Sequence, residues 1–142
     1  MDKIKKVLLP VDGSQNSRRA MEQAKSFSAI MGAEIVLLYV TGAIPHFIKG
    51  TPLVEAKKTQ KEEALQVVAP FQDFLTENDI KSSVRVLPGY QVWNTIIKVA
   101  EDEECDLIVM GSRGRGDWEG AMLGSVTHRV LAHCTLPVLV VR

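Results

Sequence analysis

The 142 residues are enough for one domain, residues 1–142, which would bury roughly two-thirds of its unfolded surface. Lys+Arg and Asp+Glu each number 17, and this zero net charge argues against binding nucleic acid through bulk charge. No apolar stretch approaches the length of a membrane span, and the N-terminus is charged, unlike a secretory signal peptide. The two cysteines make neither a disulfide framework nor a metal-ligand spacing. We therefore expect a cytoplasmic protein with no nucleic-acid or membrane partner.

The first third of the chain predicts a strand, a helix and a second strand. The apolar run Val7–Val11 is typical of a buried strand, and Pro10 has to lie at its end because it lacks an N–H. A turn at residues 12–14 follows. Apolar residues then recur at helical spacing up to Gly32, which predicts a helix that ends there; they are Ala20, Ala24, Phe27 and Met31. Residues 35–40 form a second continuous apolar run and predict another buried strand.

The middle of the chain predicts a long loop, a helix and a half-exposed strand. Residues 41–52 show no period, and we expect them to be the longest loop and a variable lid. A helix follows, and Pro70 should kink or divide it. Its apolar face comprises Ala64, Val67, Val68, Phe71, Phe74 and Leu75. Val84 and Val86 alternate with polar residues, which indicates a strand at a sheet edge.

The last third predicts two more helices and two more strands. Helical periodicity over residues 92–100 predicts a third helix, and the apolar run 107–110 predicts a buried strand. Val126 and Val130 indicate a fourth helix, and the wholly apolar residues 136–141 predict a final strand. Five apolar strands that alternate with four helices indicate an α/β fold, a parallel sheet with helices on both faces. Because an uncovered apolar edge favours pairing with another copy, we expect a homodimer through strand 136–141.

Two glycine-rich bends carry the functional signal. Strand 107–110 leads directly into Gly111-Ser112-Arg113-Gly114, where small residues let the backbone approach a ligand and aim N–H groups at it. Gly124-Ser125 opens a helix, whose N-terminal N–H groups suit an anion. Together they predict a cradle for a polyphosphate. Asp117 and Glu119 place negative charge between the two bends, and Arg113 and Arg115 partly offset it.

Better-known phosphate motifs do not fit. The segment 111–116 reads G-S-R-G-R-G, which has neither the order nor the position of the dinucleotide fingerprint G-x-G-x-x-G. Asp117-Trp118 stand where a P-loop needs its lysine and hydroxyl residue. The ends of the third and fifth strands lack the Asp and Lys of a response regulator, and the turn after the first strand carries a carboxylate where a flavodoxin holds phosphate.

The spacing Gly111-x2-Gly114-x9-Gly124-Ser125 resembles the ATP-binding signature of the universal stress protein family. Residues 7–14 resemble the family's opening strand and turn, and residues 134–141 its closing segment. The resemblance implies a single-domain, Rossmann-like fold with strand order 3-2-1-4-5, a homodimer joined through the last strands, and an ATP-type ligand. In that order the first and fourth strands are neighbours, so Asp12 and Gly111 should meet at the topological switch point.

The resemblance also implies a set of adenine-nucleotide-binding residues. They are Pro10, Val11, Asp12, Val40, Met110, Gly111, Arg113, Gly114, Gly124, Ser125, Val126 and Thr127. Asp12 would hold the nucleoside, or only form the turn; Val40 would line the adenine pocket, or only the core. Ser125 would cap its helix, contact phosphate, or both. Arg113 would pair with phosphate oxygens or stay solvated. The chain offers no metal ligands of its own, so Mg²⁺ or Mn²⁺ would bind through the phosphates.

Three functions remain open. The first is an ATP-binding regulatory, stress-response protein that acts on an unknown downstream protein. The second is a slow ATPase or phosphotransferase, for which Arg113, Arg115 and His128 are the available groups, although none has a clear partner. The third is a dimeric interaction module that binds no nucleotide. We assign no catalytic residue.

Overall fold

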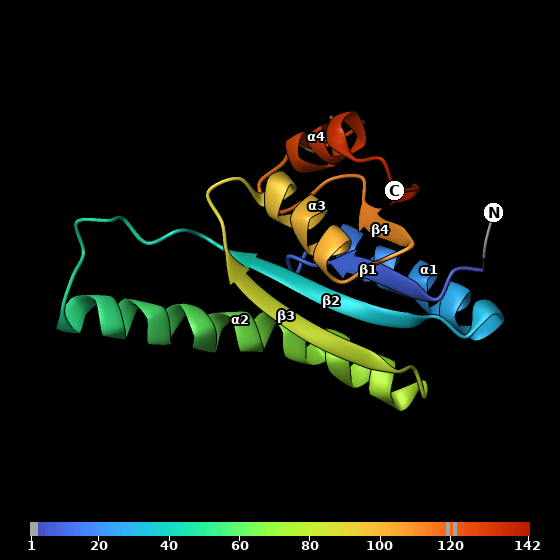
Figure 1. Ribbon diagram of the computed structural model, residues 1–142, viewed down its shortest axis with the longest axis horizontal. Coiled ribbons are helices and arrows are strands. Elements are labelled where there is room, and N and C mark those ends of the chain that lie inside the picture. Colours follow the sequence, from blue (N-terminus) through green and yellow to red (C-terminus); the bar gives the residue numbers. More distant parts are fainter. Residues whose placement is uncertain (1–2, 119, 121) are drawn as a thin grey trace.

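The computed structural model describes residues 3–118, 120 and 122–142, and Glu119 lies outside them (Figure 1). The strands are β1 (Lys6–Pro10), β2 (Glu34–Thr41), β3 (Ser82–Pro88), β4 (Leu107–Gly111) and β5 (Val138–Val141). The helices are α1 (Gln15–Met31), α2 (Thr51–Glu77), α3 (Val92–Asp102) and α4 (Ser125–His133). All paired strands are parallel, and their order β3-β2-β1-β4-β5 confirms the prediction from the sequence.

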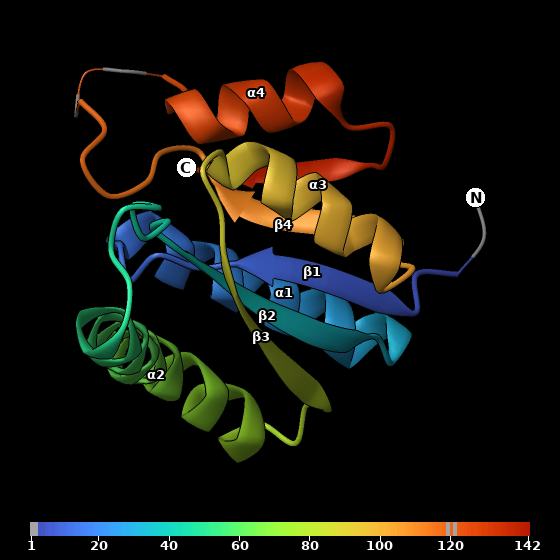
Figure 2. The ribbon, with the colours of Figure 1, turned by 60° about the vertical axis from the view of Figure 1, so that its left-hand side comes forward.

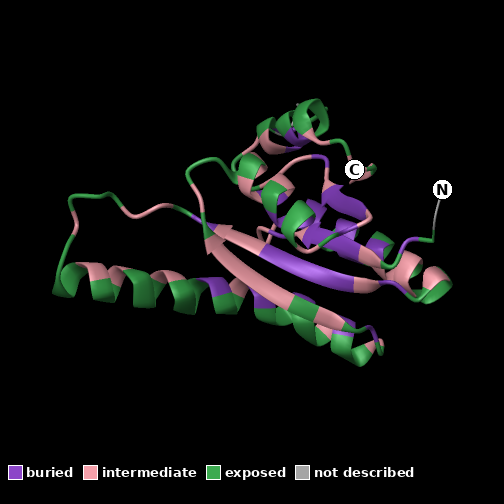
Figure 3. Cartoon of the chain, in the orientation of Figure 1, coloured by how far each residue is buried: buried purple, intermediate pink, exposed green. Residues whose placement is uncertain are grey.

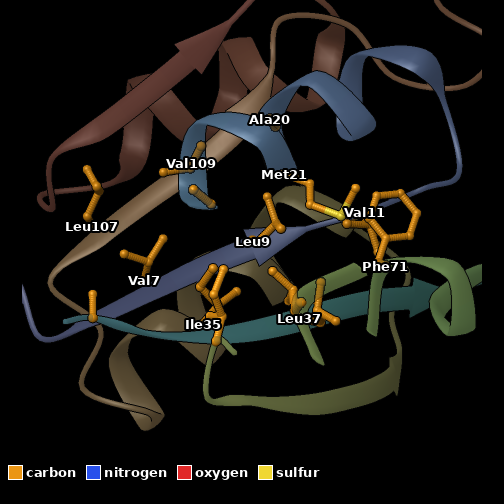
Figure 4. Packing of buried hydrophobic residues seen from close by; sticks show 14 of the residues in the cluster. Val7, Leu9, Val11, Ala20, Met21, Ile35, Leu37, Phe71, Leu107 and Val109 are labelled. Atoms are coloured by element: carbon orange, nitrogen blue, oxygen red, sulfur yellow. The ribbon is translucent and has the colours of Figure 1, made fainter. Parts of the chain in front are cut away.

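The sheet separates two apolar cores because successive strand side chains point to opposite faces. Val7 and Leu9 of β1 pack on the face covered by α1 and α2, and Figure 4 shows them with Met21 of α1 and Phe71 of α2. Leu8 lies on the opposite face, with residues from α3 and α4. Figure 2 shows α3 and α4 together on one side of the sheet and α2 on the other. Helices thus cover both faces, as expected.

Helix α2 is continuous through Pro70, so of the two expected effects, a kink or a division of the helix, the division does not occur. A proline inside a helix costs roughly 3 kcal/mol. Val68 and Phe71, on either side of Pro70, are both buried against the sheet, and their packing offsets that cost. The N-terminal half of α2 projects past the sheet and is mostly exposed (Figure 3).

Strands β3 and β5 form the two edges of the sheet. The half-exposed β3 forms one edge, which confirms that prediction. At the other edge, β5 begins at Val138 rather than Leu136, and it pairs only with β4. Pro10 ends β1 as expected, because its missing N–H is tolerated there.

Within the part of the chain that the structure describes, every helix is too short or too polar to cross a bilayer.

Candidate functional site

A cleft of about 280 Å³ opens at the carboxyl ends of β1, β2 and β4, beside the start of α4. Strands β1 and β4 are neighbours, and the order in which successive strands are added to the sheet reverses between them; open α/β sheets bind ligands at such a point. The structure brings most of the expected residues to this cleft. Those that line it are Pro10, Val11, Asp12, Val40, Met110, Gly111, Arg113, Gly114, Ser125, Val126 and Thr127.

Gly124 supports the cleft without lining it. It is buried, and its N–H donates to the Ser112 carbonyl across 2.6 Å, which joins the two glycine bends. A side chain at Gly124 would collide with the Asp117 carboxylate and would stand 3.2 Å from the Arg113 Cα. Gly124 is therefore the contact point between the loop after β4 and helix α4.

The first turn of α4 supplies N–H groups to the cleft. Gly124 is the N-cap and no side chain caps the helix, so the expectation that Ser125 caps it is wrong. The first intrahelical bond runs from the His128 N–H to the Gly124 carbonyl at 2.9 Å. The N–H groups of Ser125, Val126 and Thr127 thus have no partner in the helix, and they lie at its positive dipole end. The hydroxyl of Thr127 donates to the Gly111 carbonyl at 2.8 Å and fixes α4 to the end of β4.

The loop after β4 directs two N–H groups at carboxylates. The Gly114 N–H donates to Asp117 Oδ2, and the Arg115 N–H donates to Asp12 Oδ2, each across 2.6 Å. Both carboxylate oxygens lie within 4 Å of the point where a Gly114 Cβ would stand. These are charge-assisted hydrogen bonds to anions, the interaction that a phosphate would make with the same donors. The loop therefore has the geometry of an anion-binding site.

Asp12 stays ionised although it is partly buried. Burial raises its pKa, but hydrogen bonds from Ser14, Arg115 and Ser17 outweigh burial and hold the pKa below its ordinary value of 3.8. The Ser14 N–H donates to Asp12 Oδ1 at 2.9 Å, so Asp12 does form the local turn after β1. Its second oxygen reaches the β4 loop, and Asp12 thereby connects the two sides of the cleft.

Gly111 is required by packing. A Cβ at this position would lie 2.7 Å from the Asn16 Cβ and 3.0 Å from the Asn16 carbonyl carbon, because the start of α1 crosses the end of β4 at that point. The small residue at the first position of the motif thus brings α1, and the turn that carries Asp12, close to the loop after β4.

The other end of the cleft is apolar. Val40 borders it at the end of β2, together with residues that the sequence reading missed. The missed lining residues are Ser14, Ser17, Leu38, Tyr39, Val92 and Ile96. Arg115 and Asp117, whose charges the sequence places at the two glycine bends, line the cleft as well. In the sequence, Val92 and Ile96 stand out only because they belong to the apolar face of α3. Such a face predicts packing in the core as readily as a pocket wall.

Two further expectations concern residues that the structure places elsewhere. Residues 42–50 lie between β2 and α2 and are not the longest connection, since residues 112–124 form a longer one. None of residues 41–52 lines the cleft; Thr41, Ile48 and their neighbours line a separate cavity against Leu53 and Tyr90.

His128 does not line the cleft either. In the described ranges, no three His, Cys, Asp or Glu side chains gather as metal ligands.

Comparison with known proteins agrees with the family resemblance and the fold. The model of the universal stress protein family matches residues 3–142. Universal stress protein MJ0531 of Methanocaldococcus jannaschii is 34% identical over 97% of this chain and 82% of its own length.

Solved structures extend the comparison. The structure of the MJ0577 protein, a universal stress protein of the same organism, has a TM-score of 0.85 and 32% identity, and the match covers 99% of this chain and 96% of that one. A more distant structure, a universal stress protein in complex with cAMP, has a TM-score of 0.75 at 21% identity, covers 99% of both chains and supports the fold alone. On the family match and the close relatives, the chain belongs to the universal stress protein family.

Proposed function

We propose that the protein is an ATP-binding regulatory protein of the stress response, in which the nucleotide-bound state is recognised by a downstream protein. One observation carries this proposal. The turn after β1, the glycine loop after β4 and the first turn of α4 converge on a single cleft, and the last two direct backbone N–H groups at it. Such convergent N–H groups suit a row of phosphoryl oxygens.

The proposed orientation follows from the polarity of the cleft. The adenine would lie at the apolar end, beside Val40 and Ile96, and the phosphates would lie against Gly114 and the N-terminus of α4. Asp12, held ionised between these ends, would accept a hydrogen bond from the ribose. A Mg²⁺ or Mn²⁺ ion would bind through the phosphate oxygens, because the described residues form no cluster of metal ligands.

A regulatory role is favoured over catalysis. Arg113 and Arg115 line the cleft and bring positive charge to it, but phosphoryl transfer also needs a positioned base. His128, the base considered from the sequence, does not line the cleft. We therefore expect ATP hydrolysis to be slow or absent.

The proposal includes a homodimer formed through β5. Ile108 N–H donates to the Pro137 carbonyl and Ser112 N–H to the Val141 carbonyl, so these residues of the last segment face β4. Because hydrogen-bonding directions alternate along a strand, Val138 and Val140 point their N–H and C=O groups away from β4. This free polar edge beside partly buried valines supports pairing with the same strand of a second copy.

Calorimetric titration with ATP, ADP, AMP and cAMP tests nucleotide binding. Gly114→Val should lower ATP affinity at least tenfold, because a side chain there would enter the space next to Asp12 and block the backbone approach. Gly42→Val is the matched control, since a Cβ at Gly42 meets nothing within 4 Å. Circular dichroism would verify that both variants fold. Full ATP affinity in Gly114→Val, or no nucleotide binding by the wild type, would refute the proposal.

A further inference from the structure

The carboxylate of Asp117 lies between the two glycine bends, where the proposed function places a phosphate. Its Oδ2 accepts the Gly114 N–H at 2.6 Å, which makes it the acceptor for the central donor of the loop. The same oxygen packs against Gly124, the N-cap of α4. Asp117 thus contacts both glycines that define the second and third positions of the motif.

This placement satisfies the Gly114 N–H with a charge of the same sign as the ligand. An ionised carboxylate and a phosphate both accept charge-assisted hydrogen bonds from backbone N–H groups, and both are stabilised at a helix N-terminus. One N–H group and one space beside Gly124 cannot accommodate both anions. A phosphate that entered would also be repelled by the like charge of Asp117.

We propose, resting on the nucleotide-binding function above, that Asp117 is an internal competitor for the phosphate position and that it sets the affinity of the cleft for phosphate-bearing ligands. Binding of a nucleotide moves the Asp117 side chain off the Gly114 N–H.

The competition distinguishes ligands by their phosphates. Adenosine reaches the apolar end of the cleft without displacing Asp117, whereas AMP and ATP have to displace it. Removing the carboxylate should therefore improve binding of AMP and ATP and leave adenosine binding unchanged. A general loosening of the cleft would change the affinity for all three ligands alike.

The test compares Asp117→Ala and Asp117→Asn with the wild type by calorimetry with ATP, AMP and adenosine. Removal of a charge-assisted hydrogen bond to the competing group should tighten ATP and AMP binding by roughly tenfold or more. Asp117→Asn keeps a neutral acceptor for the Gly114 N–H and should give a smaller gain. Asp73→Ala, which removes an exposed carboxylate from α2 far from the cleft lining, is the charge-matched control and should change nothing.

Amide hydrogen exchange measured by NMR supplies a second readout. In the ligand-free wild type the Gly114 amide should be protected, and in ligand-free Asp117→Ala it should exchange faster. Unchanged or weaker ATP binding in Asp117→Ala, while the wild type binds ATP, would overturn the competitor role and leave the proposed function intact. So would an equal gain for adenosine. Absence of nucleotide binding by the wild type and both variants would refute the two proposals together.

Discussion

Asp12 and Arg115 lie 103 residues apart in the chain, yet the Arg115 N–H donates to Asp12 Oδ2 across 2.6 Å. This bond joins the turn after β1 to the glycine loop after β4, the two segments that flank the cleft. It exists because β1 and β4 are neighbours in the sheet, so that the loops at their carboxyl ends meet. The bond makes the cleft sensitive to the protonation of one carboxylate.

We predict that Asp12 stabilises the fold at neutral pH and stops doing so in acid. Its folded-state pKa lies below the ordinary value of 3.8, so its contribution is fully present above about pH 4 and is lost as the pH falls through the folded pKa. Asp12→Asn should lower the free energy of unfolding at pH 7 by on the order of 1 kcal/mol or less, because the site is partly solvated. Urea unfolding between pH 3 and pH 7 measures this. The gap between wild type and variant should shrink below pH 4, and a gap that is constant over this range would contradict the prediction.

Gly111→Ala should destabilise the protein by roughly 1–3 kcal/mol, because the added methyl group meets the Cβ and backbone of Asn16, where a fixed helix cannot easily move away. Gly42→Ala is the control, with open space at the corresponding point. Urea unfolding of both variants compares them directly. If the two substitutions cost the same, the close approach of α1 to β4 does not limit this position.

Thr127→Val should cost about 1–2 kcal/mol of unfolding free energy. The variant keeps the shape of a side chain that is 2% exposed, but it leaves the Gly111 carbonyl without the hydroxyl that donates to it at 2.8 Å. Thr59→Val, at an exposed position of α2, should stay within about 0.5 kcal/mol of the wild type. Thermal and urea unfolding give both values, and a neutral Thr127→Val would mean that this bond does not hold α4 to β4.

Val140→Pro should dissociate the proposed dimer. It removes an N–H that points away from β4 and leaves the β4–β5 bonds in place. Val84→Pro makes the equivalent change on β3. The Ile35 N–H donates to the Lys81 carbonyl, and because hydrogen-bonding directions alternate along a strand, the Val84 N–H points away from β2, toward the free edge of β3. Sedimentation equilibrium should give monomers for Val140→Pro and dimers for Val84→Pro and the wild type. The reverse pattern would move the interface to β3.

Local sequence was sufficient for the elements. Continuous apolar runs identified β2 and β4, and helical periodicity identified α1, α3 and the buried face of α2, because burial on both faces of a parallel sheet leaves a strong pattern. Pro70 shows the limit of this reasoning, since its effect depends on how firmly Val68 and Phe71 pack against the sheet. Ser125 shows another limit, because a cap is decided by one residue's backbone angles, and here Gly124 adopts them.

The sequence by itself indicated the family, the strand order through that family, and many of the residues that line the cleft, since glycine spacing and apolar runs are properties of the chain. Only the tertiary structure decided what those residues do to one another. That Gly111 makes room for Asn16, and that the Gly114 N–H already holds the Asp117 carboxylate, are consequences of distances between segments. Hydrogen bonds and steric contacts act over a few ångströms in space, and separation along the chain does not encode them.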